Sequence, residues 1–306
     1  YMAHMLEDEE LSSKTVRNRD ATLLSFIDGY LCGPTFRGPA LRADNPYQQG
    51  LISPSPKRNL VIPCSLSELQ TLMFCSEYER ERCVLQFIFD AGVRRSELPR
   101  VTLHAIKKAL DFQRHQFITN SDAPPLHTDY CPLEIAGSKG RSNQGKPRYS
   151  IVSRATLLRL QRYHSSALYR KHARKFKSDE QTPAFLNAHG EAYTANSVSK
   201  LLERLSNRAV RKLLLKKPIS PHKLRHGYAY AILRSPDLGA DYAERLYIAS
   251  KSLGHNELST TEIYTMVPFD IYSRINGSIE EVTTRAQEMQ ALSDATRLKI
   301  GLGDKK

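Results

Sequence analysis

The sequence predicts an α+β fold that is mainly helical and contains one small antiparallel sheet. Apolar residues recur at helical spacing in several long segments, whereas only two short runs, residues 132–136 and 149–153, have the character of strands. The chain has 306 residues, of which 40% are hydrophobic and 25% are charged. This composition is typical of a globular protein, and the length suggests one or two domains.

The first predicted element is a helix or helical pair at residues 10–31. Its apolar residues at helical spacing are Val16, Leu23, Leu24, Ile27 and Leu31. A stretch rich in Pro, Gly and Ser follows and indicates a linker. We therefore expect a helical unit at residues 1–45, a linker at 46–61, a larger domain at 62–267 and a C-terminal helical segment at 268–306.

The larger domain begins with a helix start that is visible in the sequence. Ser65 and Glu68 form a capping-box pattern ahead of an apolar stripe. Residues 79–91 follow as a buried helix that Gly92 ends, and residues 194–205 have the pattern of another helix.

Between these helices, the two strand-like runs flank a basic stretch that contains glycine, which predicts a hairpin with a long tip. Residues 153–177 then predict a strongly basic helix with Leu157, Leu160 and Leu168 on its apolar side. The basic residues of this helix form either a solvated face or a surface that contacts nucleic-acid phosphates.

The C-terminal segment also carries a helical stripe. Its members are Ile279, Val282, Ala286, Met289 and Leu292. A stripe of this width suits packing on its own domain or docking on a neighbouring protomer, and both interpretations remain open.

The charge balance points to a polyanionic partner. The chain has 45 Lys and Arg against 32 Asp and Glu, a net charge of +13 with a pI near 9.5. Such an excess indicates nucleic acid first, with a merely basic protein as the plain alternative. The five cysteines form no CxxC pair and no cluster with zinc spacing, as is typical of reduced structural thiols in a cytosolic protein. The sequence has no apolar run of membrane-spanning length and no signal-peptide pattern.

One helix start is unusual because it gathers basic groups. In the stretch ISPHKLRHGYAYAIL, Ser220 is expected at the N-cap and Pro221 at the first helical position. His222 and Arg225 then lie on one face of the first turn. The positive end of a helix dipole disfavours cations unless an anion lies among them. This arrangement therefore predicts a phosphate site that also uses free backbone N–H groups.

His226 lies one turn after His222, so a zinc-binding HxxxH pair is the alternative interpretation. No third ligand of a suitable type follows nearby, and the glutamate of the HExxH motif is absent. We expect neither a metal ion nor a cofactor.

Three further blocks contain residues that suit phosphate chemistry. DAGVRRSEL puts Arg94 just after a glycine that ends a helix, and SLGHNELSTTEIYTMV puts His255 nine positions before Tyr264. GSKGRSNQGKPRYS supplies lysines at the tip of the predicted hairpin.

In this order, the blocks resemble the signature motifs of the tyrosine recombinase family, the phage-integrase-like site-specific DNA recombinases. AGVRRSEL, SPHKLRHGYAYAIL and LGHNELSTTEIYT look like its three signature blocks, and the match extends from about residue 62 to residue 267. The resemblance implies the family's catalytic domain, preceded by a short helical part of a DNA core-binding domain. It also implies a C-terminal segment of the kind that commonly docks on a neighbouring protomer.

The resemblance implies roles for the matched residues. Arg94, His222, Arg225 and His255 look like the groups that hold the phosphate, and Tyr264 looks like the nucleophile. Fifteen tyrosines are present, and only the offset from His255 and the companion motifs single out Tyr264. The other tyrosines considered are Tyr228, Tyr230 and Tyr247.

Two other roles follow from the same resemblance. Glu97 looks like the buried support of Arg94, and Lys139 best matches the hairpin lysine of the family, although Lys146 competes for that role. Residues expected to contact DNA are Arg95, Arg141, Lys146, Arg148, Lys223 and His226.

These residue types suit transesterification at a phosphodiester. Each arginine can grip phosphate oxygens with two N–H groups, which stabilises the charge that grows during attack. A tyrosine has an ordinary pKa of about 10, which neighbouring arginines lower, and a lysine can protonate the departing 5′-oxygen. The product is a 3′-phosphotyrosine ester that a 5′-hydroxyl can reseal without ATP or metal.

We therefore expect the integrase or transposase of a mobile element. It would act on double-stranded DNA as a tetramer, with a dimer on each site, in the cytoplasm of a prokaryotic host. Two alternatives remain open: a DNA-relaxing enzyme that resembles type IB topoisomerases, and a DNA-binding module that has kept the fold and lost catalysis.

Overall fold

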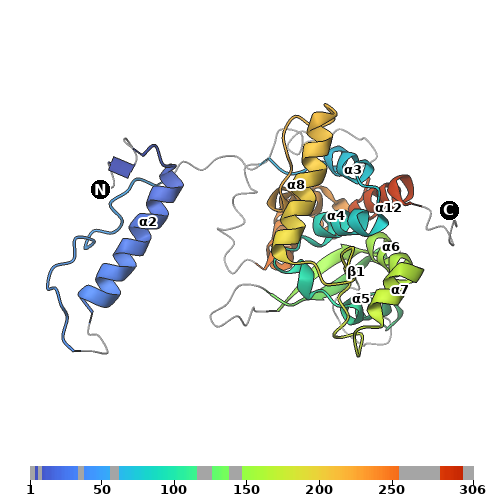
Figure 1. The fold of residues 1–306 in the computed structure, drawn as a ribbon, viewed down its shortest axis with the longest axis horizontal. Helices are drawn as coiled ribbons and strands as arrows, with labels where there is room; N and C mark the ends of the chain where they lie inside the picture. Colours follow the sequence, from blue (N-terminus) through green and yellow to red (C-terminus); the bar gives the residue numbers. More distant parts are fainter. Residues whose placement is uncertain are drawn as a thin grey trace. The chain divides into compact units, whose positions relative to one another are not determined.

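The computed structural model describes residues 4–5, 9–33, 38–55, 62–115, 126–137, 147–254 and 283–298. The chain forms two compact units, Tyr1–Leu60 and Val61–Lys306 (Figure 1). The described part is mainly helical and contains a two-stranded antiparallel sheet, which confirms the predicted fold class. Within these described ranges, no helix has the length and apolar character needed to cross a membrane.

The N-terminal unit is organised around helix α2 (Ser13–Phe26), which continues as a π-helical turn at Ile27–Leu31. The buried carboxylate of Asp20 accepts hydrogen bonds from the backbone N–H of Ser53 at 2.7 Å and from its hydroxyl at 2.6 Å. These two bonds fasten the segment after the helix back onto α2.

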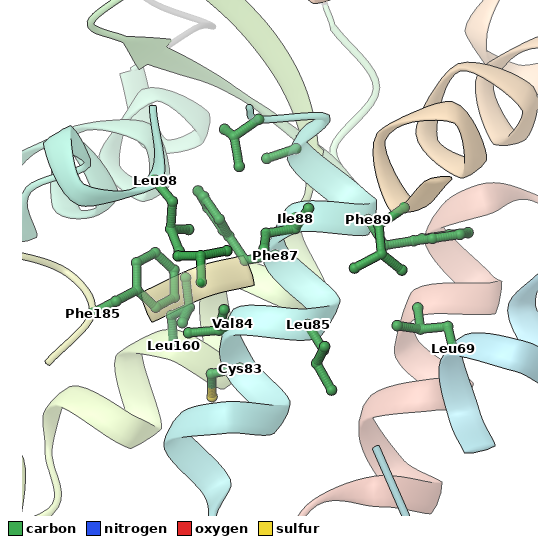
Figure 2. Packing of buried hydrophobic residues seen from close by; sticks show 14 of the residues in the cluster. Leu69, Cys83, Val84, Leu85, Phe87, Ile88, Phe89, Leu98, Leu160 and Phe185 are labelled. Carbon is green, nitrogen blue, oxygen red and sulfur yellow. The ribbon is translucent and has the colours of Figure 1, made fainter. Parts of the chain in front are cut away.

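Helix α4 (Glu79–Ala91) is the central element of the larger unit. It packs against α3, α6, α9, α12 and β2, and Figure 1 shows it in the middle of this unit. Figure 2 shows Val84, Phe87 and Ile88 of α4 pointing into the same cluster as Phe185. The aromatic rings of Phe87 and Phe185 are 4.8 Å apart. The other helices of this unit are α3 (Leu66–Phe74), α5 (Leu103–His115), α6 (Arg154–His164), α7 (Ala167–Ala173), α8 (Ala195–Arg211), α9 (Pro221–Arg234), α10 (Tyr242–Leu253) and α12 (Arg285–Thr296), with 3-10 turns at Leu98–Arg100 and Pro236–Leu238.

Two predicted helix boundaries in this unit are confirmed. Ser65 and Glu68 form a complete capping box at the start of α3. Gly92 ends α4 in the left-handed conformation, at φ 58°. A Cβ atom at this position would also lie 2.4 Å from Cδ1 of Tyr228, so the backbone angle and the close packing both require glycine.

The predicted hairpin is also confirmed. Strands β1 (Tyr130–Ile135) and β2 (Arg148–Ser153) are antiparallel. The hairpin tip, residues 138–146, lies outside the described residues. Helix α5 packs against β1, and helices α4 and α10 pack against β2.

The prediction of one basic helix over residues 153–177 is wrong. The segment forms two helices, α6 and α7, because the Ser166 hydroxyl caps a new helix by accepting a hydrogen bond from the backbone N–H of Tyr169 at 3.3 Å. Leu168, expected on the apolar side, is 54% exposed, whereas Tyr169 is buried.

Helix α12 packs against α3, α4 and α6 of its own unit in this single chain. The side-chain amide of Gln86 in α4 donates to the Met289 carbonyl at 3.2 Å and to the Ser293 hydroxyl at 2.9 Å. Arg285 at the start of α12 is fully buried and pairs with the Asp90 carboxylate at 2.6 Å. Of the predicted stripe, Ala286, Met289 and Leu292 are buried, and Ile279 and Val282 lie outside the described residues.

Candidate active site

Helix α9 begins as the sequence predicts. The Ser220 hydroxyl accepts a hydrogen bond from the backbone N–H of Lys223 at 3.2 Å, and Pro221 occupies the first helical position. The rings of His222 and His226 meet edge to face with centroids 4.1 Å apart. In the described part of the chain, no three His, Cys, Asp or Glu side chains gather as a metal ion would require.

Arg225, on the first turn of α9, connects the ends of two other helices. Its side chain is only 3% exposed. The guanidinium donates to the carbonyl oxygen of Gly92, at the end of α4, and to the carbonyl oxygen of Leu253, at the end of α10. The bond to Leu253 is 2.6 Å long. The last carbonyls of a helix have no partner within the helix and carry partial negative charge. The two helix ends therefore stabilise the buried cation.

Arg94 approaches the same place from the loop after α4. Its Nη1 donates to Oε1 of Glu97 at 2.5 Å, and its Nη2 lies 3.5 Å from the Leu253 carbonyl oxygen that Arg225 also uses. The side chain of Arg94 remains 22% exposed. The structure therefore brings the two predicted catalytic arginines together, with Arg94 open to solvent.

Glu97 is the anion at the base of this arginine cluster. It is fully buried and accepts from the Arg94 backbone N–H at 2.8 Å and from Nη2 of Arg148 at 2.8 Å, while Arg225 lies 3.8 Å away. Burial alone would raise the pKa of this carboxyl. The charge of Arg148, its hydrogen bond and the Arg94 backbone bond outweigh burial and lower the pKa to about 2.

The lowered pKa of Glu97 predicts a pH-dependent stability. A carboxyl with a folded-state pKa of about 2 and an ordinary pKa of 4.5 stabilises the fold fully above pH 4.5, and this contribution is lost as the pH falls towards 2. Its size at neutral pH is on the order of 3 kcal/mol. We expect urea unfolding to show a large difference between the wild type and Glu97→Gln at pH 7 that shrinks steadily between pH 5 and pH 2. A difference that does not change with pH would contradict the ionised, arginine-bound state of Glu97.

Three of the residues expected to contact DNA have protein partners in this structure. Arg148 is buried, and its guanidinium is bonded to Glu97 and to backbone carbonyls rather than directed at solvent. The Lys223 ammonium is paired with Glu68 at 2.7 Å, and His226 is buried against His222.

The other expected site residues have different outcomes. Arg95 is exposed and donates to the Ser199 hydroxyl at 2.9 Å. The five remaining site residues, which belong to the hairpin tip or to the last signature block, lie outside the described residues. These residues are Lys139, Arg141, Lys146, His255 and Tyr264.

Sequence reasoning missed the part that α10 plays in the site. Carbonyls of its last turn accept from the arginines, and Gly254 then ends the helix in the left-handed conformation, at φ 66°. The local signals were present, because Asp241 caps the helix by accepting from the backbone N–H of Glu244 at 2.8 Å, and a glycine follows its last turn.

The geometry is suited to binding a phosphate group. Each guanidinium has five N–H donors, and the bonds to carbonyls and to Glu97 use only some of them. Arg94, which is partly exposed, and Arg225 therefore bring two guanidinium groups, the kind of group that binds phosphate oxygens, close to the first turn of α9, which carries His222.

Comparisons with known proteins give a consistent result. Residues 65–270 match the sequence profile of the phage integrase family. Among curated relatives, tyrosine recombinase XerD of Listeria innocua is 26% identical over 85% of this chain and 73% of its own length. Tyrosine recombinase XerC of Oceanobacillus iheyensis is 27% identical over 87% of this chain and 74% of its own length.

Two solved structures have a similar fold. The XerH site-specific recombinase bound to a palindromic difH substrate aligns with a TM-score of 0.59 at 19% identity, over 89% of this chain and 68% of that one. The Tn1549 transposon integrase in complex with transposon right end DNA aligns with a TM-score of 0.55 at 18% identity, over 88% of this chain and 80% of that one. At these identities, the alignments show a shared fold.

Proposed function

Because this chain belongs to the phage integrase family of tyrosine recombinases, which are DNA strand-exchange enzymes, we propose that it cleaves and rejoins a specific DNA site through a 3′-phosphotyrosine at Tyr264. The observation that supports this proposal most is that Arg94 and Arg225 both contact the Leu253 carbonyl oxygen and both lie within 4 Å of the Glu97 carboxylate. Leu253 also lies two positions before His255 in the sequence.

In the proposed reaction, Arg94 and Arg225 hold the non-bridging oxygens of the scissile phosphate and stabilise the negative charge that develops on them. Their fixed carbonyl and carboxylate partners hold both side chains in place before DNA binds, so little reorganisation accompanies attack. His222 adds a hydrogen-bond donor or takes the phenol proton, and His255 acts in the same set.

The chemical step itself is a transesterification. The Tyr264 phenolate attacks phosphorus, the bond to the 5′-oxygen breaks, and Lys139 or Lys146 protonates the departing 5′-oxygen. A 5′-hydroxyl from another strand then attacks the phosphotyrosine and releases the phenol. The number of phosphoester bonds is unchanged throughout, so strand exchange requires no external energy source.

The biological form that we propose is the integrase or transposase of a mobile element, assembled on DNA as a tetramer with a dimer at each site. The order and spacing of the three signature blocks support a recombinase of this family, and the net charge of +13 supports a DNA partner; the mobile element and the tetramer are the further step that we propose. In this proposal, the unit Tyr1–Leu60 includes part of a DNA core-binding domain, Val61–Lys306 contains the catalytic domain, and the enzyme meets its DNA in the cytoplasm.

Covalent trapping tests the function. Duplexes with the preferred site are first selected from a randomised pool by retention on the protein. The selected duplex is then nicked a few nucleotides downstream of the cleavage position. After cleavage, the short fragment that carries the new 5′-hydroxyl diffuses away, so resealing stops. We expect a protein–DNA adduct that survives denaturing electrophoresis and leaves a 5′-hydroxyl that polynucleotide kinase can label.

The same site on a supercoiled plasmid distinguishes the alternatives. Two copies of the site should give recombinant circles. Relaxation without recombinants would favour the topoisomerase-like alternative, and specific binding without any adduct would favour the silent DNA-binding module.

A further inference from the structure

Arg148 has no part in the reaction described above, yet its guanidinium donates to three acceptors in the arginine cluster. It is the first residue of β2 and is only 8% exposed. Its guanidinium donates to the Ser252 carbonyl at the end of α10, to the Gly92 carbonyl at the end of α4 at 3.2 Å, and to Oε2 of Glu97 at 2.8 Å. One side chain therefore joins a strand, two helix ends and the buried carboxylate.

Arg148 and Arg225 connect the same two helix ends from different sides. Both donate to the carbonyl oxygen of Gly92, and they use the successive carbonyls of Ser252 and Leu253 in the last turn of α10. The relative position of α4 and α10 at the site therefore depends on both arginines.

Arg148 also fixes the support of Arg94. Glu97 has two carboxylate oxygens, and Arg94 Nη1 uses Oε1 while Arg148 uses Oε2. The Arg94 backbone N–H also donates to Oε2 at 2.8 Å, so Arg148 adds a second, charged donor to this oxygen and further restricts the carboxylate that orients the Arg94 guanidinium. Without Arg148, Glu97 would keep only the Arg94 bonds and the longer contact to Arg225 at 3.8 Å.

The packing around Arg148 is close. A Cβ atom at Gly254 would lie 2.6 Å from Cδ of Arg148, so the glycine that ends α10 leaves room for this side chain. Arg148 also follows the hairpin tip directly, two positions after Lys146.

We propose that Arg148 is a positioning residue of the cleavage site, which orients Arg94 through Glu97 and holds the ends of α4 and α10 together, without touching DNA. This inference rests on the proposed function, since it assigns Arg148 to the same site. The guanidinium of Arg148 is buried, and both of its Nη atoms donate to protein acceptors, namely Ser252, Gly92 and Glu97.

The test compares Arg148→Lys and Arg148→Met with the wild type in single-turnover cleavage of the selected nicked duplex at saturating protein. Lysine keeps the charge but cannot reach three separate acceptors, and methionine removes the charge at similar volume. Because misplacement of a supporting group typically costs about 10- to 100-fold, we expect cleavage to slow by that factor in Arg148→Met and by less in Arg148→Lys. DNA affinity and its salt dependence should remain as in the wild type, whereas loss of a phosphate contact would lower the salt slope by about one.

Arg159→Lys is the matched control. Arg159 is 2% exposed and is bonded to Glu79 at 2.7 and 3.0 Å, at the other end of α4. That end lies about 20 Å along the helix from Gly92. Arg148→Lys and Arg159→Lys each disturb a buried arginine, but only the substitutions at Arg148 should slow cleavage. Circular dichroism checks that each variant is folded.

A second variant identifies the path of the effect. If Arg148 acts through Glu97, adding Arg148→Met to Glu97→Gln should slow cleavage little beyond the slower single variant. Additive losses would overturn the path through Glu97, and unchanged cleavage in both Arg148 variants or a lowered salt slope would overturn the whole inference. Each of these results would leave the proposed function intact.

If the wild type forms no adduct, the proposed function itself fails. Crystal structures of the wild type and Arg148→Lys then decide the placement: an Arg94 guanidinium displaced from Glu97 in the variant supports the positioning role, and an unchanged Arg94 overturns it.

Discussion

Tyr264→Phe is expected to abolish the covalent adduct on the nicked duplex completely, because phenylalanine has no oxygen to attack phosphorus. DNA affinity should stay within about twofold of the wild type, since the change removes one hydroxyl and no charge. Adduct yield on a denaturing gel and affinity by fluorescence anisotropy are the two measurements.

Tyr247→Phe provides the matched control for this experiment. Tyr247 is 53% exposed on α10, and its ring lies 5.2 Å from the Lys251 ammonium. It was also one of the tyrosines that the sequence analysis weighed and ranked below Tyr264. Its variant should form the adduct at the wild-type rate. An adduct that persists in Tyr264→Phe would show that Tyr264 is not the nucleophile, and loss of the adduct in Tyr247→Phe would contradict the assignment of this role to Tyr264 alone.

Arg225→Lys is expected to reduce cleavage by about 10²- to 10³-fold, as loss of a fixed donor to a developing oxyanion typically does. Lysine keeps the positive charge, but its single ammonium cannot hold the Gly92 and Leu253 carbonyls and also grip a phosphate with two parallel N–H groups. DNA affinity should change by no more than about twofold, because the number of charges is the same.

The control for Arg225→Lys is Arg234→Lys on the same helix. Arg234 pairs with Glu288 at 2.6 Å, at the opposite end of α9 from the cluster. Its substitution should leave both cleavage and affinity unchanged. Equal losses of affinity and cleavage in Arg225→Lys would contradict a role for Arg225 in stabilising the transition state.

Parts of the fold with strong local signals were predictable. The capping box at Ser65, the glycine after α4 and the start of α9 at Ser220 each depend on residues that are close in the sequence. The hairpin followed from two short strand patterns around a basic stretch. The break between α6 and α7 was missed because Ser166 lies inside a basic, helix-forming run, where a serine does not by itself indicate a helix end. The structure shows that its hydroxyl caps α7.

The arrangement of the candidate site was less predictable than its members. Arg148 stands in a basic stretch and has the sequence character of a surface residue, but its partners Glu97, Gly92 and Ser252 are 51, 56 and 104 positions away. Burial of an arginine depends on whether such distant acceptors converge, and composition does not encode that convergence. The family motifs identified Arg94 and Arg225, whereas the support that α10 gives them became visible only in three dimensions.

The most direct test of the central claim is a crystal structure of the protein with a nicked duplex and orthovanadate, which replaces the scissile phosphate as a mimic of the transition state. We predict that the Tyr264 oxygen bonds to vanadium in line with the DNA 5′-oxygen, and that the guanidinium groups of Arg94 and Arg225 bind the equatorial oxygens. Arginines remote from the vanadate, or an oxygen from a different residue in the axial position, would contradict the account.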